Sequence, residues 1–299
     1  MIKIFEKVIK DNLSDRLNPD DLPLSYLKFS TVTSGAGLSD KVIFMVFKNR
    51  ADLPFLCLKT VRNYEAKHSI LRNFHNLQKI NKLVAGSSYE HMFSHAVCLH
   101  DDGENIFSIE TACVGSRVGK NKNKLMVAVG NYIAFQEHLA SRDSGSLRNS
   151  NELFEEAVKK SEISEVDKEK LFRHFSSLPF EISLPRIIQH GDLTPDNILL
   201  SGGGLCIVDY DDVGITDIPG FDLFCLFRRL GLPDFSVVCK KYFLEHFEKI
   251  GGKFDPENYR GLLFLYHFIE HTKKKGHNFE GISVDKIISD FERLYPATI

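Results

Sequence analysis

The chain has 299 residues, of which 43% are hydrophobic and 26% are charged, and these values are typical of a globular protein. Its 38 basic and 40 acidic residues give a formal net charge of -2, which argues against a nucleic-acid or anionic-membrane surface as the partner. No apolar run approaches the roughly 18 residues that would cross a bilayer, so we expect no membrane insertion. We expect a soluble, cytoplasmic protein.

The cysteines are scattered singly through apolar surroundings. No pair has the C-x-x-C spacing of zinc and redox motifs, so the sequence predicts buried, reduced thiols. The six positions are Cys57, Cys98, Cys113, Cys206, Cys225 and Cys239.

The first third of the chain reads as a sheet with an inserted helix. An amphipathic helix is expected at the start, where Phe5 and Ile9 lie among charged residues. Residues 27–60 predict strands separated by polar and glycine-containing turns, and residues 63–82 change to helical periodicity. The segments HAVCLHDD and NIFSIETACV then predict a hairpin that turns at Asp102-Gly103.

The remainder of the chain predicts helices with one β interruption. Segments 124–140 and 152–176 have helical patterns, as does the chain beyond residue 221. Between them, the strands NILL and LCIVD flank the turn SGGG. Because the composition changes near residues 113–118, we predict an N-terminal lobe, 1–113, and a C-terminal lobe, 114–299.

Three oxygen-bearing residues in the β interruption indicate chemistry. Asp192 precedes Asn197 by five residues, and the second strand ends in Asp209. Phosphoryl transfer requires a carboxylate that orients the attacking hydroxyl and accepts its proton, and oxygen ligands for magnesium. Oxygen ligands without a histidine or thiolate cluster favour magnesium over zinc. Each residue alone would be an ordinary cap or turn residue; their order and spacing favour function.

The motif HGDLTPDN followed by IVDYDD resembles the aminoglycoside phosphotransferase and choline kinase family, which has a protein kinase-like fold. Gly191 stands where protein kinases usually have arginine, and Asp209-Tyr210-Asp211 replaces their Asp-Phe-Gly, so both differences favour the small-molecule branch. The resemblance implies an α+β, bilobal fold with a small β-rich nucleotide-binding lobe and a larger helical lobe for catalysis and substrate binding. It also implies ATP or alternatively GTP, Mg²⁺ and a hydroxyl acceptor.

The resemblance assigns roles to individual residues of this segment. It implies that Asp192 is the catalytic base, that Asn197 is a magnesium ligand, and that Asp209 bridges metal and phosphates. Asp222 is expected to brace the catalytic loop rather than to contact substrate. Asp211 could face either the substrate or the solvent, and both alternatives stay open.

On the nucleotide side, Lys59 matches the strand lysine that contacts the α- and β-phosphates. The turn Ser34-Gly35-Ala36-Gly37 resembles the phosphate-covering loop, so Ser34, Gly35 and Gly37 are candidate contacts. The segment Glu110-Thr111-Ala112-Cys113 resembles the hinge whose backbone meets adenine, which makes Thr111 and Cys113 candidates. The alternatives are a solvated lysine, an ordinary glycine turn and an edge strand.

One position departs from the family pattern. Relatives place a glutamate in the inserted helix to pair with the strand lysine, but Asn73 occupies the expected position here, and the nearest glutamate is Glu65. Three readings stay open: the alignment slips, Glu65 serves instead, or the ion pair is absent.

Several histidines offer other interpretations. We expect His190 to have a structural role rather than to act as the catalytic base. His267, His271 and His277 with residues 273–275 (Lys-Lys-Lys) form a basic patch that is either a solvated helix face or a site for an anionic substrate.

The acceptor is only outlined by composition. Residues 213–299 hold twelve acidic and twelve basic residues, and the chain contains no tryptophan. Aminoglycosides would favour clustered carboxylates and choline an aromatic face, so a sugar or amino-sugar-like alcohol is the leading candidate. A choline/ethanolamine-type kinase, an aminoglycoside kinase and a catalytically silent nucleotide-binding protein are the alternatives.

Overall fold

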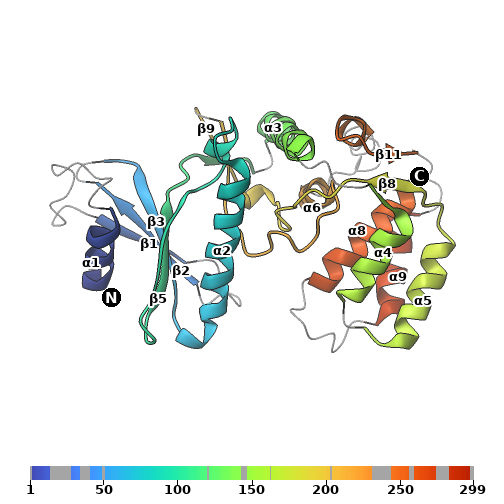
Figure 1. The fold of residues 1–299 in the computed structure, drawn as a ribbon, viewed down its shortest axis with the longest axis horizontal. Helices are drawn as coiled ribbons and strands as arrows, with labels where there is room; N and C mark the ends of the chain where they lie inside the picture. The colour runs from blue at the N-terminus through green and yellow to red at the C-terminus, as the bar shows by residue number, and fades with distance from the viewer. Residues whose placement is uncertain are drawn as a thin grey trace. The chain divides into compact units, whose positions relative to one another are not determined.

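The computed structural model describes most of the chain, in two compact units (Figure 1). The first unit contains Met1–Gly119 and Asp196–Asp211, and the second contains Lys120–Pro195 and Asp212–Ile299. The predicted contiguous lobes, 1–113 and 114–299, stay a prediction; in the structure the hairpin 196–211 is grouped with the first unit. The described residues are 2–13, 28–33, 41–48, 51–119, 121–142, 147–161, 163–202, 204–230, 244–255, 259–273 and 283–296.

A five-stranded antiparallel sheet forms the centre of the first unit, which confirms the predicted strands and the hairpin turn at Asp102-Gly103. The turn closes where the Asp102 N–H donates to the carbonyl of Asn105 at 3.2 Å. The order of the strands is β1-β2-β3-β5-β4, with bounds Lys28–Thr33 (β1), Lys41–Phe47 (β2), Pro54–Val61 (β3), Ala96–Asp101 (β4) and Ile106–Thr111 (β5).

Two helices pack against this sheet (Figure 1). Helix α1, Ile2–Leu13, buries Phe5 and Ile9 in a cluster with Leu58 and Phe107, whereas α2, Lys67–Val84, contacts the residues that alternate with these on the strands. Because side chains alternate across a strand, one face of β3 is apolar and the other presents Lys59 to α2. Short 3-10 helices, Tyr64–Ala66 and Glu90–Met92, flank α2.

A smaller sheet carries the motif residues of the first unit. The strands β9, Ile198–Ser201, and β10, Gly204–Ile207, form the predicted hairpin, and β6, Ser116–Arg117, pairs with β9. Phe93 forms an isolated parallel bridge with Ile207, so β10 also meets the segment before β4.

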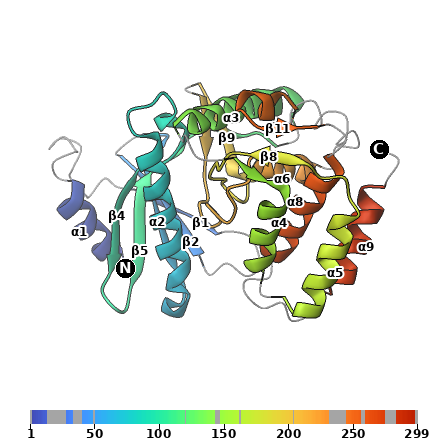
Figure 2. The same ribbon diagram turned by 45° about the vertical axis from the view of Figure 1, so that its right-hand side comes forward.

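Helices form most of the second unit, as predicted (Figure 2). Residues 152–176 form two helices with a break between them, because a new helix begins where the Ser164 side chain accepts the Asp167 N–H. Asn149 caps the first helix in the same way, through the Glu152 N–H. The helices are Lys122–Arg142 (α3), Ser150–Lys159 (α4), Glu165–Ser176 (α5), Phe221–Leu230 (α6), Tyr259–Lys273 (α8) and Val284–Leu294 (α9), and a small sheet joins Arg148–Asn149 (β7), Ile182–Leu184 (β8) and Lys253–Phe254 (β11).

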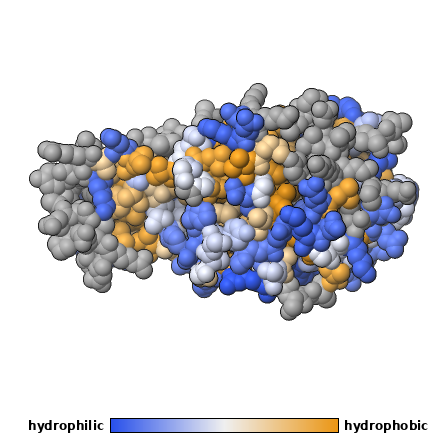
Figure 3. Space-filling view, turned by 90° about the horizontal axis from the view of Figure 1, so that it is seen from above, coloured by the Kyte–Doolittle hydropathy of each residue, from blue (hydrophilic) through white to orange (hydrophobic). Residues whose placement is uncertain are grey.

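Aromatic side chains fill the core of the second unit. The rings of Phe154 and Phe175 stack with centroids 3.8 Å apart, and Phe264 packs edge-on against Phe291. On the face shown in Figure 3, hydrophilic and hydrophobic residues are interspersed. Among the described residues, none of the helices has the length and apolar character to cross a membrane.

Candidate functional site

The two predicted metal ligands lie at the open end of one hairpin in the first unit. The Val208 N–H donates to the carbonyl of Asn197 at 3.0 Å, which extends the β9–β10 register by one pair and leaves Asp209 next in the chain. Asp209 is exposed and has φ +70°, a left-handed conformation that is uncommon outside glycine. Such backbone conformations cost about 1–3 kcal/mol and are concentrated at functional sites.

The donor set at this end of the hairpin fits magnesium. An amide oxygen from Asn197 and carboxylate oxygens from Asp209 are the hard ligands that Mg²⁺ takes, usually one or two from the protein with the rest from water and phosphates. Within the described ranges, no three histidine, cysteine, aspartate or glutamate residues gather into a group able to hold a metal.

The backbone that follows Asp209 is held by buried polar groups. Asn76 donates from Nδ2 to the carbonyls of Tyr210, at 2.9 Å, and Asp211, at 3.2 Å. The Tyr210 hydroxyl donates to the Ile207 carbonyl at 2.5 Å and accepts from the Ser94 N–H at 3.1 Å. Burial, with the nearby Glu110 carboxylate, raises the pKa of Tyr210, so it remains a neutral donor.

Lys59 has a carboxylate partner, but it does not come from the helix. Its Nζ lies 2.9 Å from Glu110 Oε1 on β5 and donates to Asn73 Oδ1 on α2 at 3.1 Å. Burial is the largest single influence and disfavours the ammonium, but the Glu110 carboxylate together with Cys57 and Tyr210 more than offsets it, so the pKa of Lys59 is raised. Glu65 is exposed in the 3-10 helix before α2. Lys59 is thus paired with Glu110 of β5 rather than with a helix glutamate, and the sequence had placed Glu110 only at the start of the hinge.

Asp211 is held by side chains of the first unit. Its Oδ1 accepts from Asn73 Nδ2 at 2.8 Å, and Lys41 at the start of β2 forms an ion pair with Oδ2. Sequence reasoning missed Lys41. The signal that could have found it is strand register: Lys41 lies two residues before Ile43, which pairs with Lys59 across β2 and β3, so Lys41 and Lys59 lie on the same face of the sheet.

The predicted hinge residues are joined to neighbouring strands. The Thr111 N–H donates to the His95 carbonyl at 2.9 Å, and the Ala112 N–H donates to the Phe55 carbonyl at 3.0 Å. These two N–H groups are therefore engaged within the sheet. The adenine contacts predicted for Thr111 and Cys113 remain a prediction.

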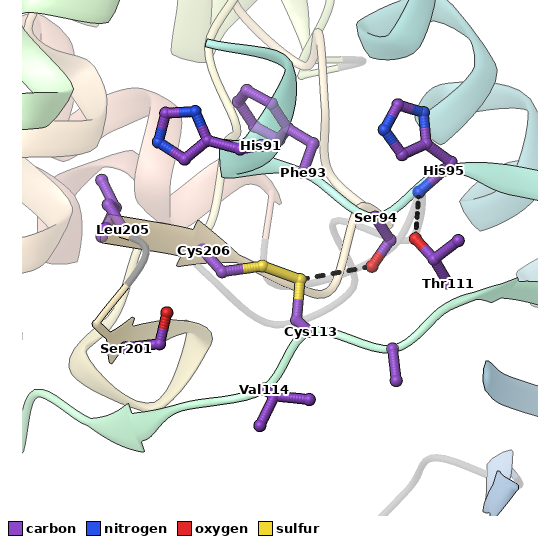
Figure 4. Close-up of a pocket in the computed structure, with 12 residues that line it drawn as sticks. His91, Phe93, Ser94, His95, Thr111, Cys113, Val114, Ser201, Leu205 and Cys206 are labelled. Atoms are coloured by element: carbon purple, nitrogen blue, oxygen red, sulfur yellow. Dashed lines mark hydrogen bonds between the residues drawn. A yellow bond between two sulfur atoms is a disulfide. The ribbon is translucent and has the colours of Figure 1, made fainter. Parts of the chain in front are cut away.

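Cys113 forms a disulfide with Cys206 on β10, with the Cα atoms 6.1 Å apart (Figure 4). This corrects the expectation of reduced thiols for these two residues, which are 93 positions apart and meet only through the sheet. Cys57, Cys98 and Cys225 are not disulfide-bonded, and burial raises the pKa of Cys57 to about 12. Cys239 lies outside the described residues.

The disulfide lines a cavity of about 280 Å³ in the first unit. Figure 4 shows His91 and His95 on the segment before β4, with Thr111 hydrogen-bonded to the His95 N–H at 2.7 Å and Ser94 Oγ 3.4 Å from Cys113 Sγ. The cavity joins the predicted hinge to the hairpin that carries the metal candidates.

Taken together, the predicted phosphate-covering turn and the predicted basic patch are only partly covered by the described residues. The turn with Ser34, Gly35 and Gly37 lies outside the described residues, so its phosphate contacts remain predictions. His267 is 0% exposed, which corrects its placement on a solvated basic face, and burial lowers its pKa to about 3. His277 and residues 274 and 275 of that patch are likewise outside the described residues.

In the second unit, Asp222 clamps the loop that precedes Asp192. Its carboxylate accepts the His190 N–H at 2.6 Å and the Gly191 N–H at 2.7 Å, and the Tyr132 hydroxyl also donates to it. Asp222 is 0% exposed, and this burial raises its pKa despite the donors. The geometry agrees with the expected bracing role of Asp222. His190 is buried beside it, as a structural residue would be.

The backbone explains why glycine stands at position 191. Gly191 has φ +84°, and a Cβ atom there would lie 2.2 Å from the carbonyl oxygen of Asp212. A side chain such as the arginine of protein kinases therefore does not fit this conformation. Asp192 follows in the same loop and is half-buried. It belongs to the second unit, whereas Asn197 and Asp209 belong to the first, so their convergence on one phosphate stays a prediction.

Residues 124–262 match the family model described as "Phosphotransferase enzyme family", which confirms the predicted resemblance. No curated protein sequence matches the chain.

Solved structures show the same kinase-like fold. A thermostable mutant of aminoglycoside phosphotransferase APH(4)-Ia, in ternary complex with ADP and hygromycin B, has a TM-score of 0.55 and 10% identity, covering 96% of this chain and 94% of that one. Aminoglycoside-3'-phosphotransferase of type VIII has a TM-score of 0.50 and 18% identity, covering 88% and 98%. At these identities the likeness shows the fold, which confirms the predicted α+β class.

Proposed function

We propose that this chain, whose residues 124–262 match the model of the phosphotransferase enzyme family, is an ATP- or GTP-dependent kinase that phosphorylates a hydroxyl of a small molecule. Asp192 orients the hydroxyl and accepts its proton. Lys59 neutralises charge on the phosphates, and Asn197 and Asp209 hold magnesium. Bound magnesium would neutralise charge that develops on the transferred phosphoryl group.

One observation carries this proposal. The buried Lys59 is linked through Asn73 to Asp211, and Asp211 lies two residues after Asp209 in the same unit. A cation suited to phosphates is therefore linked by hydrogen bonds to the segment that follows Asp209, the carboxylate suited to magnesium. A protein without a phosphate ligand has no evident need for this arrangement around a strained aspartate.

The acceptor we favour is a sugar or amino-sugar-like alcohol. Residues 213–299 carry balanced charge, which gives a polycationic acceptor little advantage.

The test is release of ADP or GDP from the magnesium nucleotide across a panel of sugars, amino sugars and amino alcohols. The variant Asp192→Ala should lose acceptor-dependent release while still binding magnesium–ATP, because the base acts in chemistry rather than in nucleotide binding. Unchanged turnover in this variant would defeat the role of Asp192. Absence of thermal stabilisation by magnesium with either nucleotide would favour a catalytically silent protein instead.

A further inference from the structure

We propose that Glu110 is the positioning residue for Lys59, and that Asn73 relays this position to the segment after Asp209. One network in the first unit would then set the phosphate-binding cation and the metal-binding carboxylate together. The inference rests on the proposed function, because it concerns the same nucleotide site.

Burial makes the Lys59 contacts decisive. Lys59, Glu110 and Asn73 are 5%, 2% and 0% exposed, so water offers the ammonium little solvation. A buried charge needs a close partner, and the Glu110 Oε1 at 2.9 Å is the carboxylate in reach. The Asn73 amide oxygen at 3.1 Å occupies a second donor of the ammonium. Together the two contacts restrict where Nζ can lie.

The sheet register gives Glu110 this position. Glu110 pairs with Cys57 across β3 and β5, and Cys57 is two residues before Lys59, so the three side chains share one face of the sheet. Paired strands hold their register, since a shift of one residue would move every side chain to the opposite face. The partner of Lys59 is therefore built into the same sheet as the lysine itself.

Asn73 is suited to be the relay because its amide has two different ends. Oδ1 accepts from Lys59 and Nδ2 donates to Asp211 at 2.8 Å, so one side chain joins a cation to a carboxylate. A carboxylate at this position could serve Lys59 but would repel Asp211. The asparagine on α2 and the glutamate on β5 are thus complementary choices.

The far end of the relay adjoins the strained aspartate. Asp211 is also paired with Lys41, and Asn76 holds the carbonyls of Tyr210 and Asp211. These contacts restrain the backbone immediately after Asp209. A change at Lys59 or Asn73 is therefore expected to reach the metal-binding residue.

Affinity for magnesium–ATP, measured by titration calorimetry, tests the positioning role. Glu110→Gln should bind roughly tenfold more weakly or worse, since a neutral amide replaces the carboxylate charge that holds Lys59, and should raise KM for magnesium–ATP more than it lowers kcat. Glu65→Gln is the matched control, because Glu65 is an exposed glutamate in the 3-10 helix before α2, and this variant should bind as the wild type does. Equal binding by Glu110→Gln and the wild type would overturn the inference.

A double-mutant cycle separates positioning from folding. If Glu110 acts through Lys59, the double variant Lys59→Met/Glu110→Gln should bind nucleotide with the same affinity as Lys59→Met alone. The double variant also removes both buried charges together, so neither is left without its partner. A further loss in the double variant would show that Glu110 acts independently of Lys59, against the proposal.

The relay has its own readout, the gain in ATP affinity produced by magnesium. Asn73→Asp keeps an oxygen beside Lys59 but sets a carboxylate against Asp211, so ATP binding in chelator should persist while the magnesium gain falls several-fold. An unchanged gain would refute the relay. A wild type that binds neither magnesium–ATP nor magnesium–GTP would refute the proposed function itself, whereas a wild type that binds, with unaltered variants, would refute this inference alone.

Discussion

Asp222 and Gly191 are 31 positions apart in the chain, yet the Gly191 N–H donates a hydrogen bond to Asp222 Oδ1 at 2.7 Å. The aspartate lies in the first turn of α6, and the glycine begins the loop of the proposed base. This bond ties the catalytic loop to a helix of the same unit. It makes the loop's geometry depend on a residue that is not expected to contact substrate.

Asp222→Asn should destabilise the second unit. Each carboxylate oxygen of Asp222 accepts a backbone N–H, so an amide nitrogen at either place would oppose a donor and leave it unpaired. A buried unpaired donor costs about 1–3 kcal/mol. Urea unfolding measures the change, and the exposed Asp52→Asn is the control. A stability equal to that of the wild type would mean that the clamp contributes nothing.

Gly191→Ala should cost more than the same change at Gly103. Both glycines have positive φ, +84° and +88°, but a Cβ at 191 would meet the Asp212 carbonyl at 2.2 Å whereas nothing lies within 4 Å at 103. The pair therefore separates steric overlap from backbone conformation. We expect an excess destabilisation of at least ~2 kcal/mol for Gly191→Ala in denaturant unfolding. Equal losses at the two sites would contradict the close approach of the loops.

Reduction of the Cys113–Cys206 disulfide should lower stability. The bond spans 93 residues, and constraint of an unfolded loop of this length is worth about 4.6 kcal/mol. Unfolding in guanidinium with and without dithiothreitol measures the difference, and the double variant Cys113→Ser/Cys206→Ser should be insensitive to the reductant. Cys98→Ser, at a free cysteine, should keep the wild-type response. Alkylation of both thiols in the untreated protein would show that they are not bonded.

Mild acid should weaken the fold through His246. This histidine is 0% exposed, and its ring nitrogens have no hydrogen-bond partner among the residues that the structure describes. Burial, assisted by Lys249, lowers the pKa of His246 from 6.5 to about 4. The unfolded chain therefore takes up its proton first as the pH falls, and stability is lost between about pH 6.5 and about pH 4.

The loss attributable to His246 is roughly 3 kcal/mol across that window. His246→Phe should remove about this part of the decline in urea unfolding measured at a series of pH values, and the exposed His68→Gln should leave the full decline in place. A decline that is identical in His246→Phe and the wild type would exclude this histidine as its source.

Much of the fold was predictable from local patterns. The strands of the first unit show apolar alternation, and α2 shows helical periodicity that buries Ile70 and Leu77. The break between α4 and α5 was missed, although Asn149 and Ser164 are ordinary capping residues. Asp192, Asn197 and Asp209 were found as candidates because they lie close together in the chain with characteristic spacing.

The partner of Lys59 could not be predicted in the same way. The helix position showed only Asn73, and Glu110 lies 51 positions from Lys59, on a strand that the sequence did not place beside it. The Lys41–Asp211 pair and the Cys113–Cys206 disulfide were missed for the same reason.

The sequence alone therefore determined the α+β class and the family resemblance, and it predicted the residues proposed to carry the chemistry, since these depend on periodicity and short motifs. Only the tertiary structure decided which carboxylate meets Lys59, which thiols are joined, and why position 191 excludes a side chain. Those outcomes depend on strand register and on close approach of distant backbone segments, and neither is encoded in any local stretch of residues.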